Sequence, residues 1–143
     1  MINEVAAQLG KNYPGINLRV HNQNTMTIFP KDENGFEIVI QSNDSGYVIY
    51  FGKWHLHFEK TEEGKNELLD YLGFGMSKFG RLKVHSKNGA EYKWTFEILN
   101  QLDGKWYPAG TMGTVNLKFW QKEEIKYFQN DLISFDNPDE KNG

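Results

Sequence analysis

Two histidines separated by one residue have the clearest potential for chemistry in this chain. His55 and His57 lie in the segment YFGKWHLHFE, whose alternation of apolar and polar residues is typical of a β-strand. Residues two apart on a strand share a face, so both imidazoles could bind one metal ion, with Glu59 in the same row. The spacing supplies no third ligand, which could come only from tertiary approach of His21, Asp44 or His85. We therefore expect no functional metal site.

A row of cationic residues is the second such feature. Arg81, Lys83 and His85 alternate with apolar residues in the segment RLKVHS, so a strand would place all three on its polar face. This row could bind an anion or nucleic acid, but Glu91 and Glu97 follow in the next predicted strand and can balance its charge. The net charge of −3, with interspersed signs, also argues against nucleic acid as a partner.

Motifs for catalysis or for cofactors are weak or absent. The sequence has no cysteine, and no serine has the glycine-flanked context of a nucleophile elbow. The glycines in GFG (73–75) and GTMG (110–113) are too sparse for a phosphate-binding loop. The acidic pairs Glu62-Glu63 and Glu123-Glu124 suit helix starts, turns and solubility better than acid–base chemistry. We expect no catalytic residue and no cofactor, which favours a non-enzymatic protein over an enzyme.

Trp106 is the tryptophan that best suits a contact surface. The pattern places the other three tryptophans mostly in the core. A type I′ turn at Asp103-Gly104 would set Trp106 opposite Gln101 and leave it exposed. Exposed tryptophan is typical of interfaces, although packing under a neighbouring loop would explain Trp106 equally well.

The composition is that of one globular domain. The chain has 143 residues, of which 38% are hydrophobic and 15% aromatic, enough to bury a core without disulfides. We expect a single α+β domain over residues 1–135 and a polar, disordered tail over 136–143. No window approaches the ~18 consecutive apolar residues of a membrane span, and the N-terminus has no basic leader. With the absence of cysteine, these features predict a cytoplasmic protein that does not bind membranes.

Residues 36–59 predict three antiparallel strands in a definite register. A loop at Asn43–Gly46 pairs Ile40 with Ile49, and a type II′ turn at Gly52-Lys53 pairs Ile49 with Leu56. The two loops are independent cues, yet both place the same apolar side chains on one face. A shift of the pairing by one residue would move the apolar side chains of a strand to the opposite face. That face consists of Ile38, Ile40, Tyr47, Ile49, Phe51, Trp54, Leu56 and Phe58.

The opposite face of these strands mixes apolar and titratable side chains, with Tyr50 beside His55 and Val48 beside His57. The principal helix should cover the wholly apolar face, because that face has the stronger need for burial. The mixed face would then be open to a ligand or partner. It consists of Val39, Gln41, Val48, Tyr50, His55, His57 and Glu59.

Helical periodicity is strong in one segment. Thr61 suits an N-cap, and a stripe of leucines ending at Met76 predicts the principal helix over 62–77, with Gly80 suited to its termination. A short helix is predicted over 2–9, which Gly10 would stop.

Further strands are predicted on either side of this helix. They lie at 16–20 and 25–29, at 96–102 and 105–109 around the Asp103-Gly104 turn, and at 114–120. Residues 125–130 fit either a helix or a strand, and we favour a strand.

Two cues compete in a hairpin over residues 81–99. The Asn88-Gly89 pair favours a two-residue loop, which would set polar Lys83 opposite Trp94 and mix the two faces. A three-residue loop over 87–89 pairs Leu82 with Trp94 instead. We favour the second register, because the apolar pattern decides which face is buried.

Several stretches carry a resemblance to other proteins. With YFGKWHLHF, GRLKVHS, YKWTFEIL and KWYPAGTMG, the chain resembles a group of small uncharacterised bacterial proteins that share YFGxWHxHF and YKWT-type stretches. The similarity spans most of residues 36–130. It implies a bacterial origin and a shared fold, and since that group carries no assigned activity, it transfers no catalytic residue.

These patterns predict an α+β fold in which a mainly antiparallel, hairpin-connected curved sheet of roughly eight strands carries one principal helix at 62–77. A partly open barrel is the alternative. The expected function is that of a non-enzymatic binding protein of the bacterial cytoplasm, an antitoxin or immunity-type partner of another protein. The alternative is a small-molecule-binding protein or enzyme with a pocket around Tyr50, His55 and His57. The candidate binding residues are Tyr50, His55, His57, Arg81, Lys83, His85 and Trp106.

Overall fold

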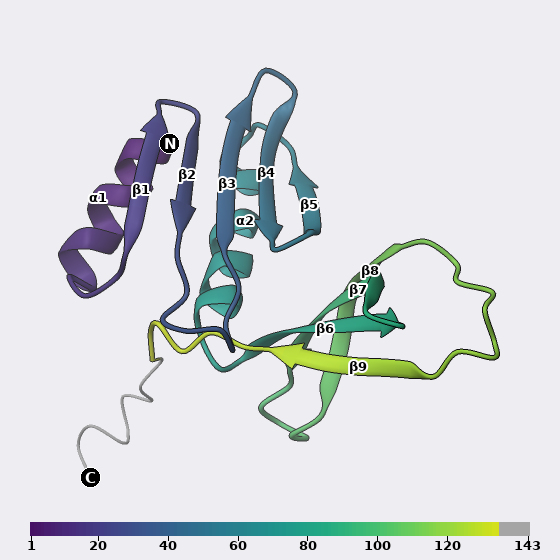
Figure 1. The fold of residues 1–143 in the computed structure, drawn as a ribbon. Coiled ribbons are helices and arrows are strands. Elements are labelled where there is room, and N and C mark those ends of the chain that lie inside the picture. The colour runs from purple at the N-terminus through teal and green to yellow at the C-terminus, as the bar shows by residue number, and fades with distance from the viewer. Residues whose placement is uncertain (135–143) are drawn as a thin grey trace, which may run out of the picture.

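A computed structural model describes residues 1–134, which form two helices and nine strands (Figure 1). The first half contains α1 (Ile2–Asn12), β1 (Leu18–Asn22), β2 (Thr25–Ile28), β3 (Ile38–Asn43), β4 (Gly46–Phe51) and β5 (Trp54–Phe58). The second half contains α2 (Glu62–Met76), β6 (Gly80–Lys87), β7 (Ala90–Leu99), β8 (Trp106–Gly113) and β9 (Glu123–Phe128). The predicted α+β class with mainly antiparallel sheets is confirmed.

The strands divide between two sheets instead of forming one. Within the described range, the first sheet has the order β1-β2-β3-β4-β5 and the second has the order β8-β7-β6-β9, and neither closes into a barrel. The predicted tail at 136–143 lies outside the described residues.

The predicted register of the central meander is confirmed. Ile40 pairs with Ile49 between β3 and β4, and Ile49 pairs with Leu56 between β4 and β5. Gly52 has a φ of 58°, as the first central position of a type II′ turn requires. Ile40 and Ile49 are fully buried, but Leu56 is only half-buried because it lies on the edge strand.

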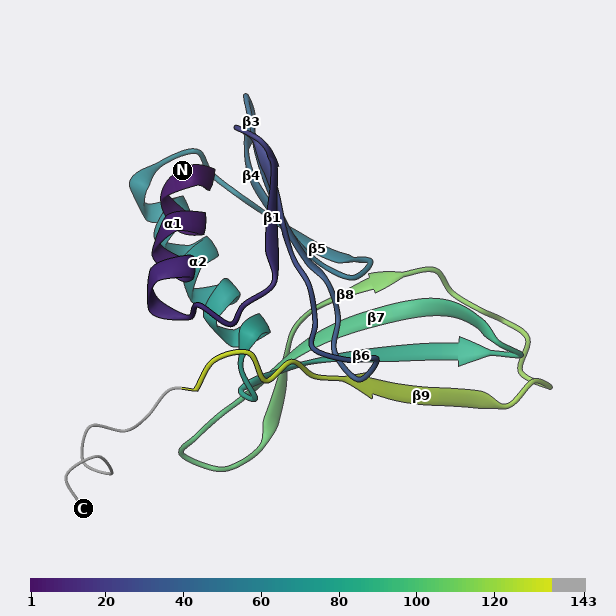
Figure 2. The same ribbon diagram turned by 60° about the vertical axis from the view of Figure 1, so that its left-hand side comes forward.

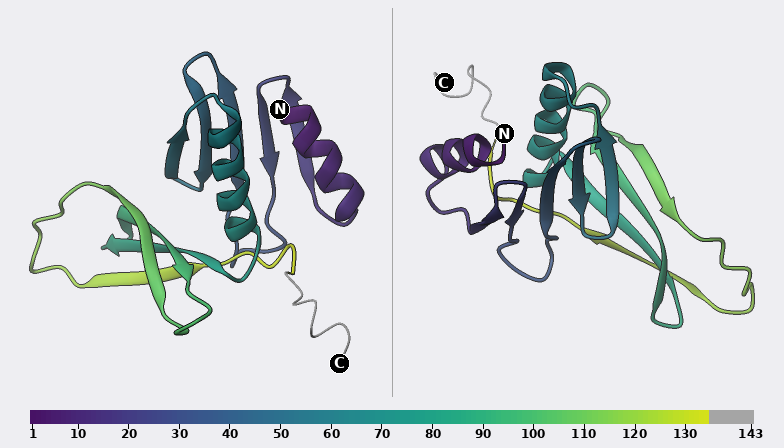
Figure 3. Two further views of the ribbon diagram at one scale, coloured as in Figure 1. Left: turned by 180° about the vertical axis from the view of Figure 1, so that it is seen from behind. Right: turned by 90° about the horizontal axis from the view of Figure 1, so that it is seen from above.

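Both helices cover the apolar face of the first sheet, as Figures 2 and 3 show. Leu68, Leu72 and Met76 of α2 share the core with the buried residues of β3 and β4, so the expected placement of the principal helix is confirmed. The hydroxyl of Thr61 accepts a hydrogen bond from the amide of Gly64, which confirms the predicted N-cap.

Two expected helix ends are wrong. Gly10 does not stop α1, which continues to Asn12. Gly80 does not end α2, because the backbone already becomes extended at Ser77. Gly80 begins β6 instead, where a Cβ would lie 2.6 Å from the ring of Phe96, so close packing rather than termination explains this glycine.

The second sheet packs against the end of the first through aromatic rings. The ring of Phe96 in β7 lies 4.5 Å from that of Phe51 and 5.2 Å from that of Trp54. The indole N–H of Trp54 donates a hydrogen bond to the carbonyl of Gly110 in β8, at 3.1 Å. One hydrophobic core therefore runs from the helices through the first sheet to the inner face of the second.

The register predicted for the β6–β7 hairpin is wrong. Leu82 pairs with Phe96, and Lys87 pairs with Ala90 across a two-residue loop. Asn88 and Gly89 both have positive φ, as a type I′ turn requires. A β-bulge opposite His85 and Ser86 inserts one extra residue into β7 and restores the apolar face. The two-residue turn at Asn88-Gly89 and the matching of apolar faces are therefore both satisfied, because the extra residue lies in the bulge and not in the loop.

The expected type I′ turn at Asp103-Gly104 does not form. β7 ends at Leu99, which pairs with Trp106, and a longer loop connects the strands. In this loop the amides of Asn100 and Gly104 donate to the carbonyls of Lys105 and Asn100. Trp106 therefore faces Leu99 and not Gln101.

The strand expected at 114–120 is absent, whereas the strand favoured at 125–130 is confirmed as β9. β8 and β9 lie on opposite edges of the second sheet. The connecting residues cross from one edge to the other, and they pair with neither β8 nor β9.

Asn130 joins the segment after β9 to the first half of the fold. This buried side chain accepts from the amide of Phe36 and donates to the carbonyls of Phe36 and Gly75, at 3.0–3.1 Å. The contacts bring together the segment before β3, the end of α2 and the segment after β9.

Candidate functional site

The predicted histidine row forms on the open face of the first sheet. The rings of Tyr50 and His55 lie 5.3 Å apart, and those of His55 and His57 lie 5.5 Å apart. His57 is exposed and His55 is half-buried. Within residues 1–134, no group of three or more His, Cys, Asp or Glu side chains is arranged to hold a metal ion.

Arg81 lies between two aromatic rings on the outer face of the second sheet, which is the face directed away from the core. Its guanidinium carbon is 4.2 Å from the ring centre of Trp106 and 4.2 Å from that of Tyr127. Its Nε donates to Glu97 at 2.7 Å. Cation–π contacts on both sides and a short ion pair fix the guanidinium in one orientation. The expectation that Trp106 is exposed is wrong, because this packing leaves it half-buried.

His85 lies further along β6 on the same face, but it is buried. Its Nδ1 is 2.9 Å from Oε1 of Glu123, and the hydroxyl of Tyr92 donates to Oε2 of the same carboxylate. The hydrogen bonds from Tyr92 and then His85 hold the pKa of Glu123 below its ordinary value, and the bond to Glu123 raises the pKa of the Tyr92 phenol.

Lys83 lies between Arg81 and His85 on β6, as the alternation predicts, beside Thr95 of β7 and Tyr127 of β9. The predicted binding residues thus form two groups on different sheets. Tyr50, His55 and His57 are in one group, and Arg81, Lys83, His85 and Trp106 are in the other.

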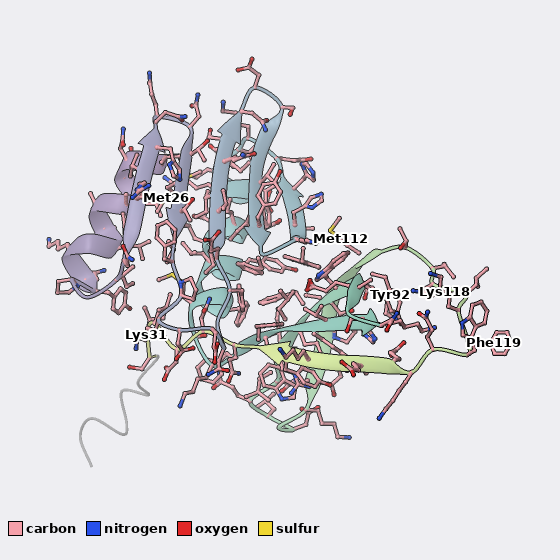
Figure 4. All side chains as sticks on the ribbon, viewed as in Figure 1. Met26, Lys31, Tyr92, Met112, Lys118 and Phe119 are labelled. Atoms are coloured by element: carbon pink, nitrogen blue, oxygen red, sulfur yellow. The ribbon has the colours of Figure 1, made fainter. Side chains whose placement is uncertain are left out.

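A cluster of exposed apolar residues in the described part of the chain was not anticipated by the sequence patterns. We call residues 114–122 the apolar loop; it connects β8 to β9. Val115, Leu117, Phe119 and Trp120 are 82%, 80%, 87% and 69% exposed. Trp120 therefore does not lie in the core as expected. Figure 4 shows Phe119 at the extreme end of the molecule, pointing away from the sheet.

The backbone of the apolar loop is held by polar contacts. Nζ of Lys87, at the end of β6, donates to the carbonyls of Asn116 and Lys118 at 3.1 and 3.3 Å. The amide of Lys118 donates to the side chain of Asn116, and the amide of Gln121 donates to the carbonyl of Lys118. These hydrogen bonds hold part of the loop backbone in place while its apolar side chains are exposed to water.

The apolar loop adjoins further exposed apolar residues of β9. Ile125 and Tyr127 are 44% and 48% exposed, and they pair with His85 and Lys83 of β6. Loop and outer face together form a surface of aromatic, aliphatic and charged side chains. A signal for it was present in the sequence, since alternating apolar residues at 115–119 have no strand partner.

A groove of about 780 Å³ lies between α1 and α2 on the opposite side of the molecule. Its walls are mainly apolar, and an ion pair between Lys65 and Glu4 spans its rim at 3.5 Å. Tyr50, His55 and His57 do not line it. The apolar lining residues are Val5, Leu9, Leu69, Leu72, Phe74, Met76, Phe79 and Ile133.

Neither helix in the described part of the chain is long and apolar enough to cross a membrane. Comparison of the chain with family models, with curated proteins and with solved structures found no match.

Proposed function

We propose that this chain is a non-enzymatic protein-binding protein of the bacterial cytoplasm, of the antitoxin or immunity type. The observation that carries the proposal is the apolar loop. Monomeric soluble proteins rarely expose contiguous large apolar patches unless the patch binds something. Four large apolar side chains within six residues, three of them at least 80% exposed, are such a patch.

The contacts of Lys87 support a binding role for the loop. A loop that is already ordered loses less conformational entropy when it binds, so more of the contact energy appears as affinity. Lys87 donates hydrogen bonds to two loop carbonyls. The loop backbone is therefore already ordered before its apolar side chains bind a partner.

The outer face beside the loop has the composition of a contact surface. Arg, Tyr and Trp are enriched at interfaces and among the residues that dominate binding energy. Arg81, held between Trp106 and Tyr127, and the neighbouring Lys83 supply these types. Arg81 and Trp106 lie at the end of this sheet away from the loop. A partner that covers the loop and extends along the whole outer face would therefore use Arg81, Lys83 and Trp106 as secondary contact residues.

The bacterial setting rests on the sequence resemblance. The antitoxin or immunity role rests on the absence of any recognisable catalytic motif in the sequence and on the aromatic-rich surface of mixed charge. A protein of this type acts by covering a surface of another protein, which requires an exposed contact surface and no chemistry. The alternative with a pocket around Tyr50, His55 and His57 receives less support, because the large groove is lined by other residues.

The test uses the gene next to that of this chain in its source genome. We expect expression of the neighbour to arrest growth, co-expression of this chain to restore it, and the two proteins to co-purify. The double substitution Leu117→Ser/Phe119→Ser should abolish rescue and co-purification. Leu102→Ser is the matched control, since Leu102 is 98% exposed on the β7–β8 loop. Full rescue by the double variant, or a harmless neighbour that does not bind, would reject the proposal.

A further inference from the structure

The apolar loop and the α1–α2 groove are opposite in shape and lie at opposite ends of the molecule. In Figures 1 and 2 the helices are on one side and the connection between β8 and β9 projects from the other. The loop projects four apolar side chains into water, whereas the groove is an apolar cavity of about 780 Å³. Since the two features are at opposite ends, the loop cannot fill the groove of its own molecule.

The dimensions of the two features agree. The α2 residues that line the groove run from Lys65 to Met76, which is about 16 Å along a helix axis. The segment from Val115 to Trp120 spans at most about 20 Å when extended. A volume of this size is also in the range that holds a drug-sized ligand, so it can accept several large side chains.

The charges of the two features are complementary. Lys118 and Lys122 are exposed within the apolar loop. The groove lining carries two carboxylates, Glu4 and Asp70, and one cation, Lys65, and therefore has a net negative charge. Lysines of the loop would meet carboxylates at the rim while the apolar side chains enter the groove.

We propose that the apolar loop of one copy of this chain occupies the α1–α2 groove of a second copy. This inference rests on the proposed function, in that it takes the loop to be a protein-docking element, and it names a partner for it. The contact joins two different surfaces, so each molecule offers one loop and one groove. Phe119 and Trp120 supply most of the buried area, because aromatic side chains bury the most surface.

Two single-surface variants test the contact. Phe119→Ser/Trp120→Ser removes the loop contact and keeps the groove. Gln8→Trp fills the groove from an exposed position of α1 that lines it and keeps the loop. Leu102→Ser and Ala7→Trp are matched controls, since Leu102 and Ala7 are exposed and outside both surfaces. Circular dichroism and thermal melting establish that each variant is folded.

Sedimentation velocity of the purified proteins gives the outcome. The wild-type chain and both controls should associate, each single-surface variant should be monomeric, and an equal mixture of the two variants should form a one-to-one dimer. That mixture holds one intact loop and one intact groove on different molecules, so only a loop–groove contact restores association.

The other outcomes overturn the inference. A wild-type chain that stays monomeric at its highest soluble concentration excludes the contact. A mixture that stays monomeric while the wild type associates points to contact between two loops or between other surfaces. A small molecule retained in the groove, detected by native mass spectrometry and lost in Gln8→Trp, assigns the groove to that ligand.

The same variants separate this inference from the proposed function. Gln8→Trp should still bind the product of the neighbouring gene, because it leaves the apolar loop intact. If the copies do not associate but loop substitutions still abolish that binding, the inference fails and the proposed function stands. If the copies associate through loop and groove while the neighbour's product does not bind, the antitoxin or immunity role fails, whereas the loop remains a protein-docking element whose partner is a second copy.

Discussion

His85 of β6 contacts Glu123 of the edge strand β9 on the outer face of the second sheet, with Nδ1 of the imidazole 2.9 Å from Oε1 of the carboxylate. Tyr92 binds the other carboxylate oxygen. These contacts favour the ionised carboxylate and lower the pKa of Glu123. A carboxyl with a depressed pKa in the folded state contributes stability above its unfolded pKa of about 4.3, and this contribution is lost as the pH falls through the lower folded value.

The first prediction concerns this carboxylate. Tyr92→Phe removes the largest cause of the shift, so the pKa of Glu123 should rise toward its ordinary value. The stability should then fall at every pH above about 4.3, and the difference from the wild type should shrink as the pH falls below that value. NMR titration of the side-chain carboxyl carbon measures the pKa. Tyr107→Phe is the control, because the hydroxyl of Tyr107 binds Asp103 instead. An unchanged pKa of Glu123 in Tyr92→Phe would show that the hydrogen bond does not stabilise the anion.

The second prediction concerns two helical glycines. A Cβ at Gly75 would lie 2.5 Å from the ring of Phe51, which cannot move because it is fully buried against Trp54 and Phe96. Gly75→Ala should therefore destabilise the protein by about 1–3 kcal/mol despite its higher helix propensity. At Gly10 a Cβ meets nothing within 4 Å, so Gly10→Ala should stabilise by about 0.5–1 kcal/mol. Urea denaturation measures both, and equal effects would contradict the packing of α2 on Phe51.

The third prediction tests the register of the first sheet. Ile49 is fully buried and pairs with both Ile40 and Leu56, so Ile49→Ala should cost about 2–5 kcal/mol. Val20→Ala is the control, because Val20 is 39% exposed in β1 and surface changes usually stay within about 0.5 kcal/mol. A loss below that limit at Ile49 would be incompatible with this core.

The fourth prediction concerns the contacts that order the apolar loop. Lys87→Met removes both hydrogen bonds to the loop carbonyls and should leave global stability nearly unchanged while the loop opens more often. Limited chymotrypsin digestion should then cleave faster after Phe119 and Trp120. Lys93→Met is the control, since Lys93 lies on β7 and makes neither contact. Equal cleavage rates in the two variants would mean that Lys87 does not restrain the loop.

Much of the first sheet could be predicted from sequence, because local turns and alternating faces specify the same pairing at Ile40, Ile49 and Leu56. The β6–β7 hairpin could not, since a bulge accepts one extra residue and no face-matching rule locates it. The alternation at 115–119 indicated a row of apolar side chains correctly, but this segment runs from the β8 edge of the second sheet to its β9 edge and pairs with neither strand. The groove could not be predicted either, because it depends on the distance between α1 and α2. The sequence pattern of a helix indicates which of its faces is apolar, but not how far it lies from another helix.

Asn130 also has a consequence for how the chain folds. Its bonds to Phe36 join positions 94 residues apart in sequence, and contacts between distant residues slow folding because a long loop must close first. During synthesis, the first sheet and α2 are complete well before this asparagine leaves the ribosome. Until then, the amide and carbonyl of Phe36 and the carbonyl of Gly75 lack their hydrogen bonds to the Asn130 side chain. Asn130 therefore completes these contacts late, and folding intermediates of this chain should expose the end of α2 until the segment after β9 has been synthesised.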